Sequence, residues 1–194
     1  DWSSDLCSSV LFGAAACRHG EVVFNTSMTG YQEILSDPSY AGQIVAMTYT
    51  QIGNVGVNAS DAESRGHFLS GFVIKELSSA PSNYRSEGSL CELLDESGVP
   101  GISSIDTRAL VRRIRDHGAQ VGVLSTDPAR QDEAELLALA RRSPGLDGRD
   151  LVAEVTCDAP YAWREGRWPG IEGQLPRPSR PPPTFKAVAY DFGG

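Results

Sequence analysis

The chain has 194 residues, 40% of them hydrophobic and 22% charged, which is ordinary usage for a globular protein. Its formal net charge of -8 argues against nucleic acid or an anionic membrane surface as the main partner. No apolar run approaches the ~18 residues that a membrane-spanning helix needs, so we expect a soluble, cytoplasmic protein with no membrane partner.

Residues 20–58 contain two predicted strands around a polar loop. The runs 21–24 and 43–49 are typical of strands, because β-branched and aromatic side chains suit a half-buried pleated surface. Between them lie a short apolar turn at 31–35 and the sequence Asp37-Pro38-Ser39-Tyr40. A polar loop held by two strands is a common way to present a recognition surface.

Strands and helices alternate along the rest of the chain. We expect, in order, a surface loop (61–67), a buried strand (69–77), a helix capped by Ser89 and stopped by Gly98, an extended piece (100–102), a helix (107–117) capped by Asp106 and ended by Gly118, a strand (119–125) and a helix (131–142). This pattern predicts an α/β or α+β domain with a mixed sheet.

The composition changes sharply near the end of the chain. Residues 175–184 read LPRPSRPPPT, which favours an extended polyproline linker over the alternative of an SH3-type ligand. Residues 185–194 form an apolar run that leads into glycines, typical of the first strand of a further α/β domain.

The residues by themselves define no catalytic or metal site. The four cysteines, at positions 7, 17, 91 and 157, show no C-x-x-C pair and no zinc-ligand spacing with His19, His67 or His117, so we interpret them as reduced structural thiols. The glycines of 53–56 indicate a turn and not a phosphate loop. The arginines at 108, 112, 113 and 115 indicate a solvated helix face or a docking face.

Many segments nevertheless resemble one family in order along the chain. They are GEVVFNT (20–26), MTGYQEIL (28–35), DPSY (37–40), IGNVG (52–56), PSNYR (81–85), PGI (100–102), IDTRAL (105–110), RDHGA (115–119), PGLDG (144–148) and AYDFG (189–193). Together they resemble the small, glutamine-hydrolysing subunit of carbamoyl phosphate synthetase, over about residues 20–194.

The resemblance implies a fold and a division of the chain. An atypical N-terminal segment (1–19) would precede a swivelling β/β/α domain with a mixed sheet (20–174). The Pro-rich linker (175–184) would then lead into the truncated start of a class I glutamine amidotransferase domain (185–194).

The resemblance also implies an activity and its partners. The small subunit hydrolyses L-glutamine and passes ammonia to the large subunit, which is expected to bind ATP and Mg and to make carbamoyl phosphate from bicarbonate for arginine and pyrimidine synthesis. The serine of the DPSY loop, Ser39, would contact glutamine, since a hydroxyl both donates and accepts hydrogen bonds. The alternative for Ser39 is an ordinary turn residue. No cofactor or metal is expected on this chain.

Three departures from the family pattern bear on these expectations. The catalytic Cys, His and Glu belong downstream of residue 194, so no catalytic residue is assigned here and the fragment is expected to lack glutaminase activity. The family's opening hairpin is not recognisable in 1–19, which could leave a sheet edge unpaired. Thr50 stands where proline is common. The alternative function is a non-catalytic docking module, or a truncated product, that only binds the synthetase subunit.

Overall fold

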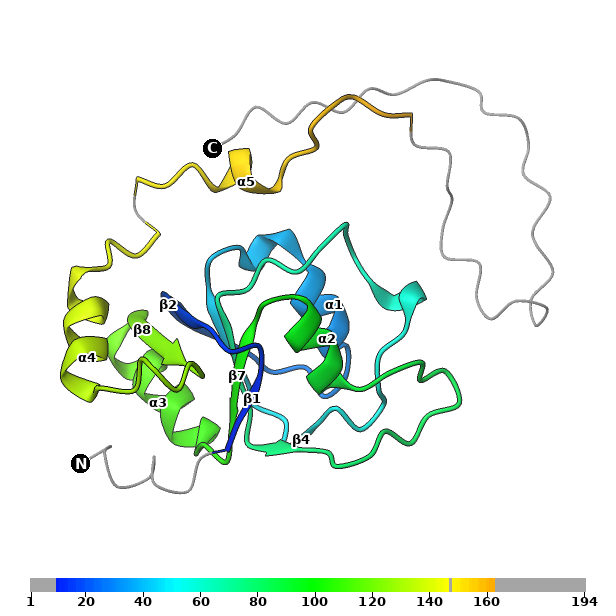
Figure 1. Ribbon diagram of the computed structural model, residues 1–194, viewed down its shortest axis with the longest axis horizontal. Helices are drawn as coiled ribbons and strands as arrows, with labels where there is room; N and C mark the ends of the chain where they lie inside the picture. The colour runs from blue at the N-terminus through cyan, green and yellow to red at the C-terminus, as the bar shows by residue number, and fades with distance from the viewer. Residues whose placement is uncertain (1–9, 147, 163–194) are drawn as a thin grey trace. The chain divides into compact units, whose positions relative to one another are not determined.

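A six-stranded mixed sheet forms the centre of this computed structural model, which describes residues 10–146 and 148–162 (Figure 1). The strands are β1 (Val10–Gly13), β2 (Cys17–Asn25), β3 (Ile44–Met47), β5 (Gly71–Val73), β7 (Pro100–Ser103) and β8 (Gln120–Ser125). A separate pair consists of β4 (Gln51–Ile52) and β6 (Glu76–Leu77). The helices are α1 (Tyr31–Ser36), α2 (Leu90–Glu96), α3 (Thr107–His117), α4 (Glu133–Arg142) and α5 (Leu151–Val155), with 3-10 turns η2 (Pro38–Tyr40) and η3 (Ala59–Asp61). The prediction of a mixed α/β fold is confirmed.

The chain divides into two units, Asp1–Leu151 and Val152–Gly194. All the strands among the described residues and helices α1 to α4 belong to the first unit, and the described residues of the second hold most of α5. The predicted linker 175–184, the strand 185–194 and Cys7 lie outside the described residues. The predicted boundary at residue 174 does so as well.

The sheet order is β1-β7-β5-β3-β2-β8, with parallel pairs in the middle and antiparallel pairs at both edges. Only Ala14, Ala15 and Ala16 connect β1, at one edge, to β2, which lies next to the other edge. The sheet must therefore curl to let so short a connection span it. The Thr126 hydroxyl, just after β8, donates to the Ala14 carbonyl and accepts from the Ala16 N–H, so it fastens this connection to the β8 edge.

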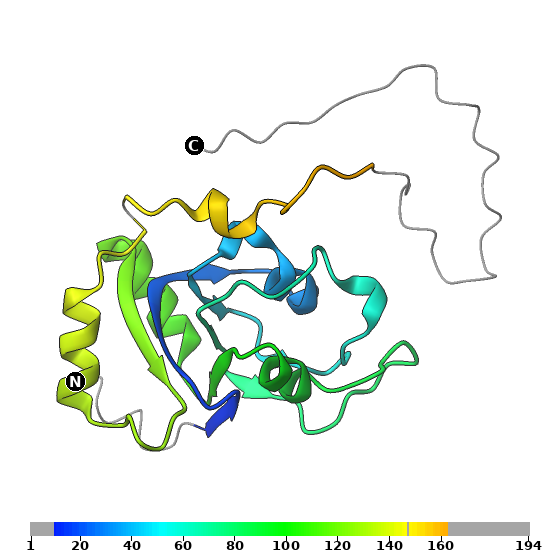
Figure 2. The same cartoon turned by 45° about the horizontal axis from the view of Figure 1, so that its top comes forward.

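Strand β3 is buried on both faces, which explains its continuous apolar sequence IVAM. Val45 and Met47 belong to the larger core cluster, which also receives Ile34 and Leu35 of α1 and Leu90 and Leu94 of α2. Ile44 and Ala46 belong to a second cluster, against which Leu110 of α3 packs. Helices α1 and α2 lie close together beside the sheet, and α4 packs against β8 (Figures 1 and 2).

The helix caps agree with the expectations from the sequence. The Ser89 hydroxyl accepts from the Glu92 N–H, and the Glu92 carboxylate accepts from the Ser89 N–H, which completes a capping box at the start of α2. The carboxylate also accepts from the Ser89 hydroxyl at 2.8 Å, and the two bonds that it accepts from Ser89 hold the pKa of Glu92 below its usual value. Asp106 caps α3 through the Ala109 N–H at 3.0 Å, and Gly118 with φ 80° follows its last residue.

The N-terminal segment differs from the expectation of an unpaired edge. Strand β1 pairs antiparallel with β7, from Val10 opposite Ser103 to Gly13 opposite Pro100. The ring of Phe12 lies where a Cβ at Gly101 would come within 2.7 Å of it, so the glycine makes room for the pairing. A short apolar run was enough to form a strand once β7 offered this surface.

Two further boundaries were predicted incorrectly. The run 69–77 is not one strand, because Ile74 and Lys75 separate β5 from β6, which belong to different sheets. The turn at 31–35 is the helix α1. In both places the tertiary neighbours decide the geometry, since short apolar runs fit several local structures.

Candidate functional site

The loop Asp37–Tyr40 displays Ser39 at the surface. The Asp37 carboxylate accepts from the Ser39 backbone N–H at 2.8 Å, and Pro38 sets the first residue of the 3-10 turn η2. Ser39 is exposed, and among the described residues nothing forms a hydrogen bond with its hydroxyl. The alternative of an Asx turn is thus present in the backbone, while the hydroxyl stays available to a ligand.

The loop is fastened at its far end to the sheet. The Asn25 side chain, at the end of β2, donates to the Tyr40 hydroxyl at 3.0 Å. Gly42, with φ 72°, donates its N–H to the Phe68 carbonyl at 3.0 Å. A Cβ at Gly20 would lie 2.1 Å from the Gly42 carbonyl oxygen, so β2 and the loop approach more closely than any side chain would permit.

Helix α1, which leads into the loop, is anchored at both ends. The buried Tyr31 donates its hydroxyl to the Gly56 carbonyl at 2.7 Å, and burial raises its pKa to about 12. At the other end, the fully buried Ser36 hydroxyl donates to the Gln32 carbonyl and accepts from the Glu63 N–H, each at 2.9 Å. These bonds give the six-residue helix a stability that its length alone would not provide.

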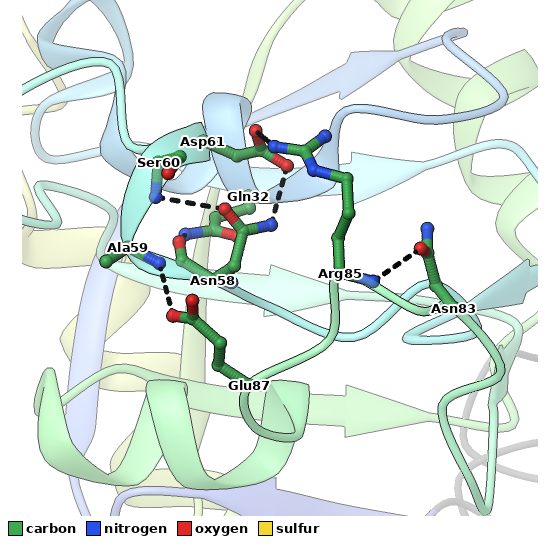
Figure 3. A network of polar contacts seen from close by, with 8 residues as sticks. All are labelled: Gln32, Asn58, Ala59, Ser60, Asp61, Asn83, Arg85 and Glu87. Atoms are coloured by element: carbon green, nitrogen blue, oxygen red, sulfur yellow. Dashed lines mark hydrogen bonds and ion pairs between the residues drawn. The ribbon is translucent and has the colours of Figure 1, made fainter. Parts of the chain in front are cut away.

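A polar network joins α1 to two later loops (Figure 3). Gln32 exchanges two hydrogen bonds with the backbone of Asn58, and the Asn58 side chain donates to Asp61 at 2.7 Å. Asp61 in turn pairs with Arg85, and Glu87 accepts from the Ala59 N–H at 2.9 Å. We call these side chains the Gln32–Arg85 network. The sequence did not predict this network, although Gln32 and Arg85 lie in two of the segments that resemble the family, 28–35 and 81–85.

The hollows in the described part of the first unit include two that polar side chains line. One, of about 200 Å³, lies beside the network. Its lining residues are Thr29, Gly30, Tyr31, Gln32, Glu33, Val55, Gly56, Asn58, Asp61, Asn83 and Arg85. The other, of about 370 Å³, is lined by Cys17, Arg18, His19, Ser70, Pro144, Gly145 and Arg149. Ser39 lines neither of these two hollows.

The described cysteines form no disulfide. Cys17, Cys91 and Cys157 are free, and burial raises the pKa of the Cys91 thiol, which makes it a weak nucleophile. Within residues 10–146 and 148–162, no three His, Cys, Asp or Glu side chains are placed to hold a metal ion. In the same part of the chain, no helix combines the length and the apolarity that crossing a membrane requires.

Comparisons with known proteins assign the class of this chain. A family model described as carbamoyl-phosphate synthase small chain, CPSase domain, matches residues 4–124. The chain is 54% identical over 182 residues to the carbamoyl phosphate synthase small chain of Syntrophotalea carbinolica, covering 94% of this chain and 47% of that protein. It is 53% identical to the small chain of Rhodopirellula baltica (93% and 47%) and 50% identical to the chloroplastic small chain of Oryza sativa subsp. japonica (94% and 40%).

The chain belongs to the carbamoyl-phosphate synthase small chain family. This confirms the resemblance seen in the sequence. The chain spans about half the length of the curated relatives it matches.

Proposed function

We propose that this chain is the N-terminal part of the small subunit of a glutamine-hydrolysing carbamoyl phosphate synthase. In this role it docks on the large subunit, which receives ammonia from L-glutamine and uses bicarbonate and ATP with Mg to make carbamoyl phosphate. Family membership and identities near 50% to proteins named as small chains support the proposal. A cytoplasmic location stays a prediction, because plant relatives are named chloroplastic.

The site proposal concerns Ser39. We propose that its hydroxyl binds L-glutamine as one wall of a site whose other walls come from an amidotransferase domain. The observation that carries this is the exposed Ser39 hydroxyl on a loop that three contacts hold in place. They are the hydrogen bond from the Ser39 N–H to Asp37, the hydrogen bond from Asn25 to Tyr40, and the close approach of Gly20 to Gly42. A loop fixed in advance loses little conformational entropy when it binds a ligand.

This chain is proposed to contribute no catalytic nucleophile. The buried surroundings of Cys91 disfavour its thiolate, and no role in glutamine hydrolysis is proposed for Cys17 or Cys157. The 194-residue chain alone is therefore expected not to hydrolyse glutamine.

The test replaces Ser39 with Ala in a full-length small subunit that contains this sequence, in complex with the large subunit. Carbamoyl phosphate synthesis is measured with glutamine and separately with ammonia. We expect kcat/KM for glutamine to fall about tenfold, the effect of losing one good hydrogen bond, with ammonia use unchanged. Equal loss with both nitrogen donors would refute the glutamine-binding role.

Ser60→Ala is a matched control. Ser60 is also exposed and donates its N–H to the side chain of an Asx residue two positions earlier, Asn58, at 2.9 Å. It reproduces the local turn of Ser39 at another place in the fold. Its substitution is expected to leave both activities unchanged.

The alternative is a docking module that binds the large subunit without supporting glutamine hydrolysis. Both the working small subunit and the docking module should co-purify with the large subunit, whereas a product that binds nothing should not. A complex that forms, but that uses only ammonia even when an amidotransferase domain is present, would favour the docking module.

A further inference from the structure

Helix α3 carries a row of exposed arginines. Arg108, Arg112 and Arg115 are spaced i, i+4 and i+7, which places them on one face of the helix over about 10 Å. Arg113 is also exposed, but it lies about 100° around the helix axis from Arg112 and so outside this face. We call Arg108, Arg112 and Arg115 the arginine row.

The opposite face of α3 is anchored in the core. Thr107 and Ile114 are buried, and Leu110 packs against the cluster that contains Ile44, Ala46 and Leu124. The Asp106 cap fixes the start of the helix. The row is thus carried by a rigid element and not by a mobile loop, so it can present a fixed pattern of charge.

The row concentrates positive charge on an acidic protein. Four of the chain's 17 Lys and Arg residues lie within residues 108–115, although the formal net charge is -8. Of these arginines, Arg115 alone forms an ion pair with another described residue, Asp116, at 2.9 Å. The hydrogen bond from Arg115, with the fields of His117 and Arg112, holds the pKa of Asp116 below its usual value.

The fold itself gains little from this arrangement. Like charges at i and i+4, such as Arg108 and Arg112, destabilise an isolated helix, and exposed ion pairs contribute little. Arg141 and Arg142, by contrast, end α4, where cations interact favourably with the helix dipole. Arg115 lies in the last turn of α3 and shares this favourable interaction, whereas Arg108 and Arg112, nearer the start of the helix, do not.

We propose that the arginine row docks on an acidic surface of the synthetase large subunit. Arginine is enriched at protein interfaces, and its planar group binds carboxylates through paired hydrogen bonds. The net negative charge of the chain disfavours the phosphate backbone of a nucleic acid as the occupant of the row. The inference rests on the proposed function, since it specifies which surface makes the association.

The test compares two charge-matched variants of the 194-residue chain. Arg108→Glu/Arg112→Glu alters the row, and Arg141→Glu/Arg142→Glu makes the same change in charge at the exposed end of α4. Binding to purified large subunit is measured at 50 and 500 mM NaCl, and circular dichroism verifies that each variant is folded. Arg108→Gln/Arg112→Gln, which keeps good helix formers without reversing charge, serves as a second variant.

We expect the Glu variant of the row to bind at least tenfold more weakly at 50 mM NaCl, with a smaller difference at 500 mM because salt screens exposed charges. The Gln variant should show a smaller loss and the α4 variant less than a twofold change. If the unchanged chain binds and all variants bind equally, the row is not the docking surface, while the proposed association stands. If the unchanged chain does not bind, the association and the row are both overturned. Binding of the unchanged chain to duplex DNA in preference to the large subunit also overturns the proposal.

Discussion

Gln32 and Asn58 form a reciprocal pair across 26 residues of sequence. The Gln32 Nε2 donates to the Asn58 carbonyl at 2.5 Å, and the Asn58 N–H donates to the Gln32 Oε1 at 3.0 Å. Gln32 is only 6% exposed, so its amide serves the loop backbone in place of water. This pair connects α1, and through it the Ser39 loop, to the Gln32–Arg85 network.

Gln32→Ala should lower the free energy of unfolding by about 3 kcal/mol, because it leaves a half-buried donor and acceptor without partners. Urea denaturation measures the change. Gln51→Ala is the control: its exposed amide reaches Glu76 only at 3.5 Å, and its loss should cost less than about 0.5 kcal/mol. Similar costs for both variants would contradict a structural role for the Gln32–Asn58 pair.

Gly20→Ala should destabilise the protein by more than about 2 kcal/mol, because the new methyl group would meet the Gly42 carbonyl oxygen and force β2 and the loop apart. Thermal unfolding measures the cost. Gly66→Ala, where a Cβ meets nothing within 4 Å, should change stability by less than about 1 kcal/mol. In full-length protein, Gly20→Ala should also raise KM for glutamine if the loop positions Ser39. Unchanged stability would show that the loop adapts without cost.

Ser104→Gly should stabilise the protein by up to about 1 kcal/mol. Ser104 has φ 64°, the only positive φ of a non-glycine residue in the described part of the chain, and it is exposed. A left-handed conformation costs an L-residue roughly 1–2 kcal/mol, more than the entropy lost by introducing glycine. Denaturant unfolding should show the gain. Ser27→Gly, at an exposed serine without positive φ, should give no gain in stability. A lower stability for Ser104→Gly would mean that the Ser104 side chain makes stabilising contacts.

The stability of the protein should fall as the pH drops below about 6.5, partly through His67. The Ser97 hydroxyl donates to the Leu93 carbonyl at 2.5 Å, so its oxygen accepts from His67 Nδ1 at 2.9 Å. His67 Nε2 is then a bare acceptor, buried with no hydrogen-bond partner among the described residues. Burial lowers the pKa of His67.

The direction of this effect follows from proton binding. Since the folded pKa lies below the unfolded value, the unfolded state binds the proton first on acidification. The contribution of His67 is therefore complete above pH 6.5 and is lost as the pH falls through the folded pKa. Urea unfolding at pH 7.5 and 5.0 should show a shallower decline for His67→Phe than for the unchanged protein. His117→Gln, which removes an exposed histidine at the end of α3, is the control, and an equal decline for His67→Phe and the unchanged protein would exclude His67 as a contributor.

Much of the local structure was predictable because its causes lie within a few residues. Ser89 and Asp106 cap α2 and α3 as their positions in the sequence indicated, and Gly98 and Gly118 follow the helix ends with positive φ. The strands around residues 21–24 and 43–49 and the mixed α/β class were also confirmed. Caps, turn glycines and apolar periodicity act locally, so they can be read from a single sequence.

The sequence by itself also determined the family, because many short segments match in order and the family model agrees. Only the tertiary structure decided that Val10–Gly13 pairs with β7, that Ile74 and Lys75 divide a single apolar run between two sheets, and that Gln32 binds Asn58. Each of these depends on groups far apart in the chain. Such contacts form only when the whole fold brings a buried donor, acceptor or strand edge next to its partner. Local sequence patterns therefore do not predict them.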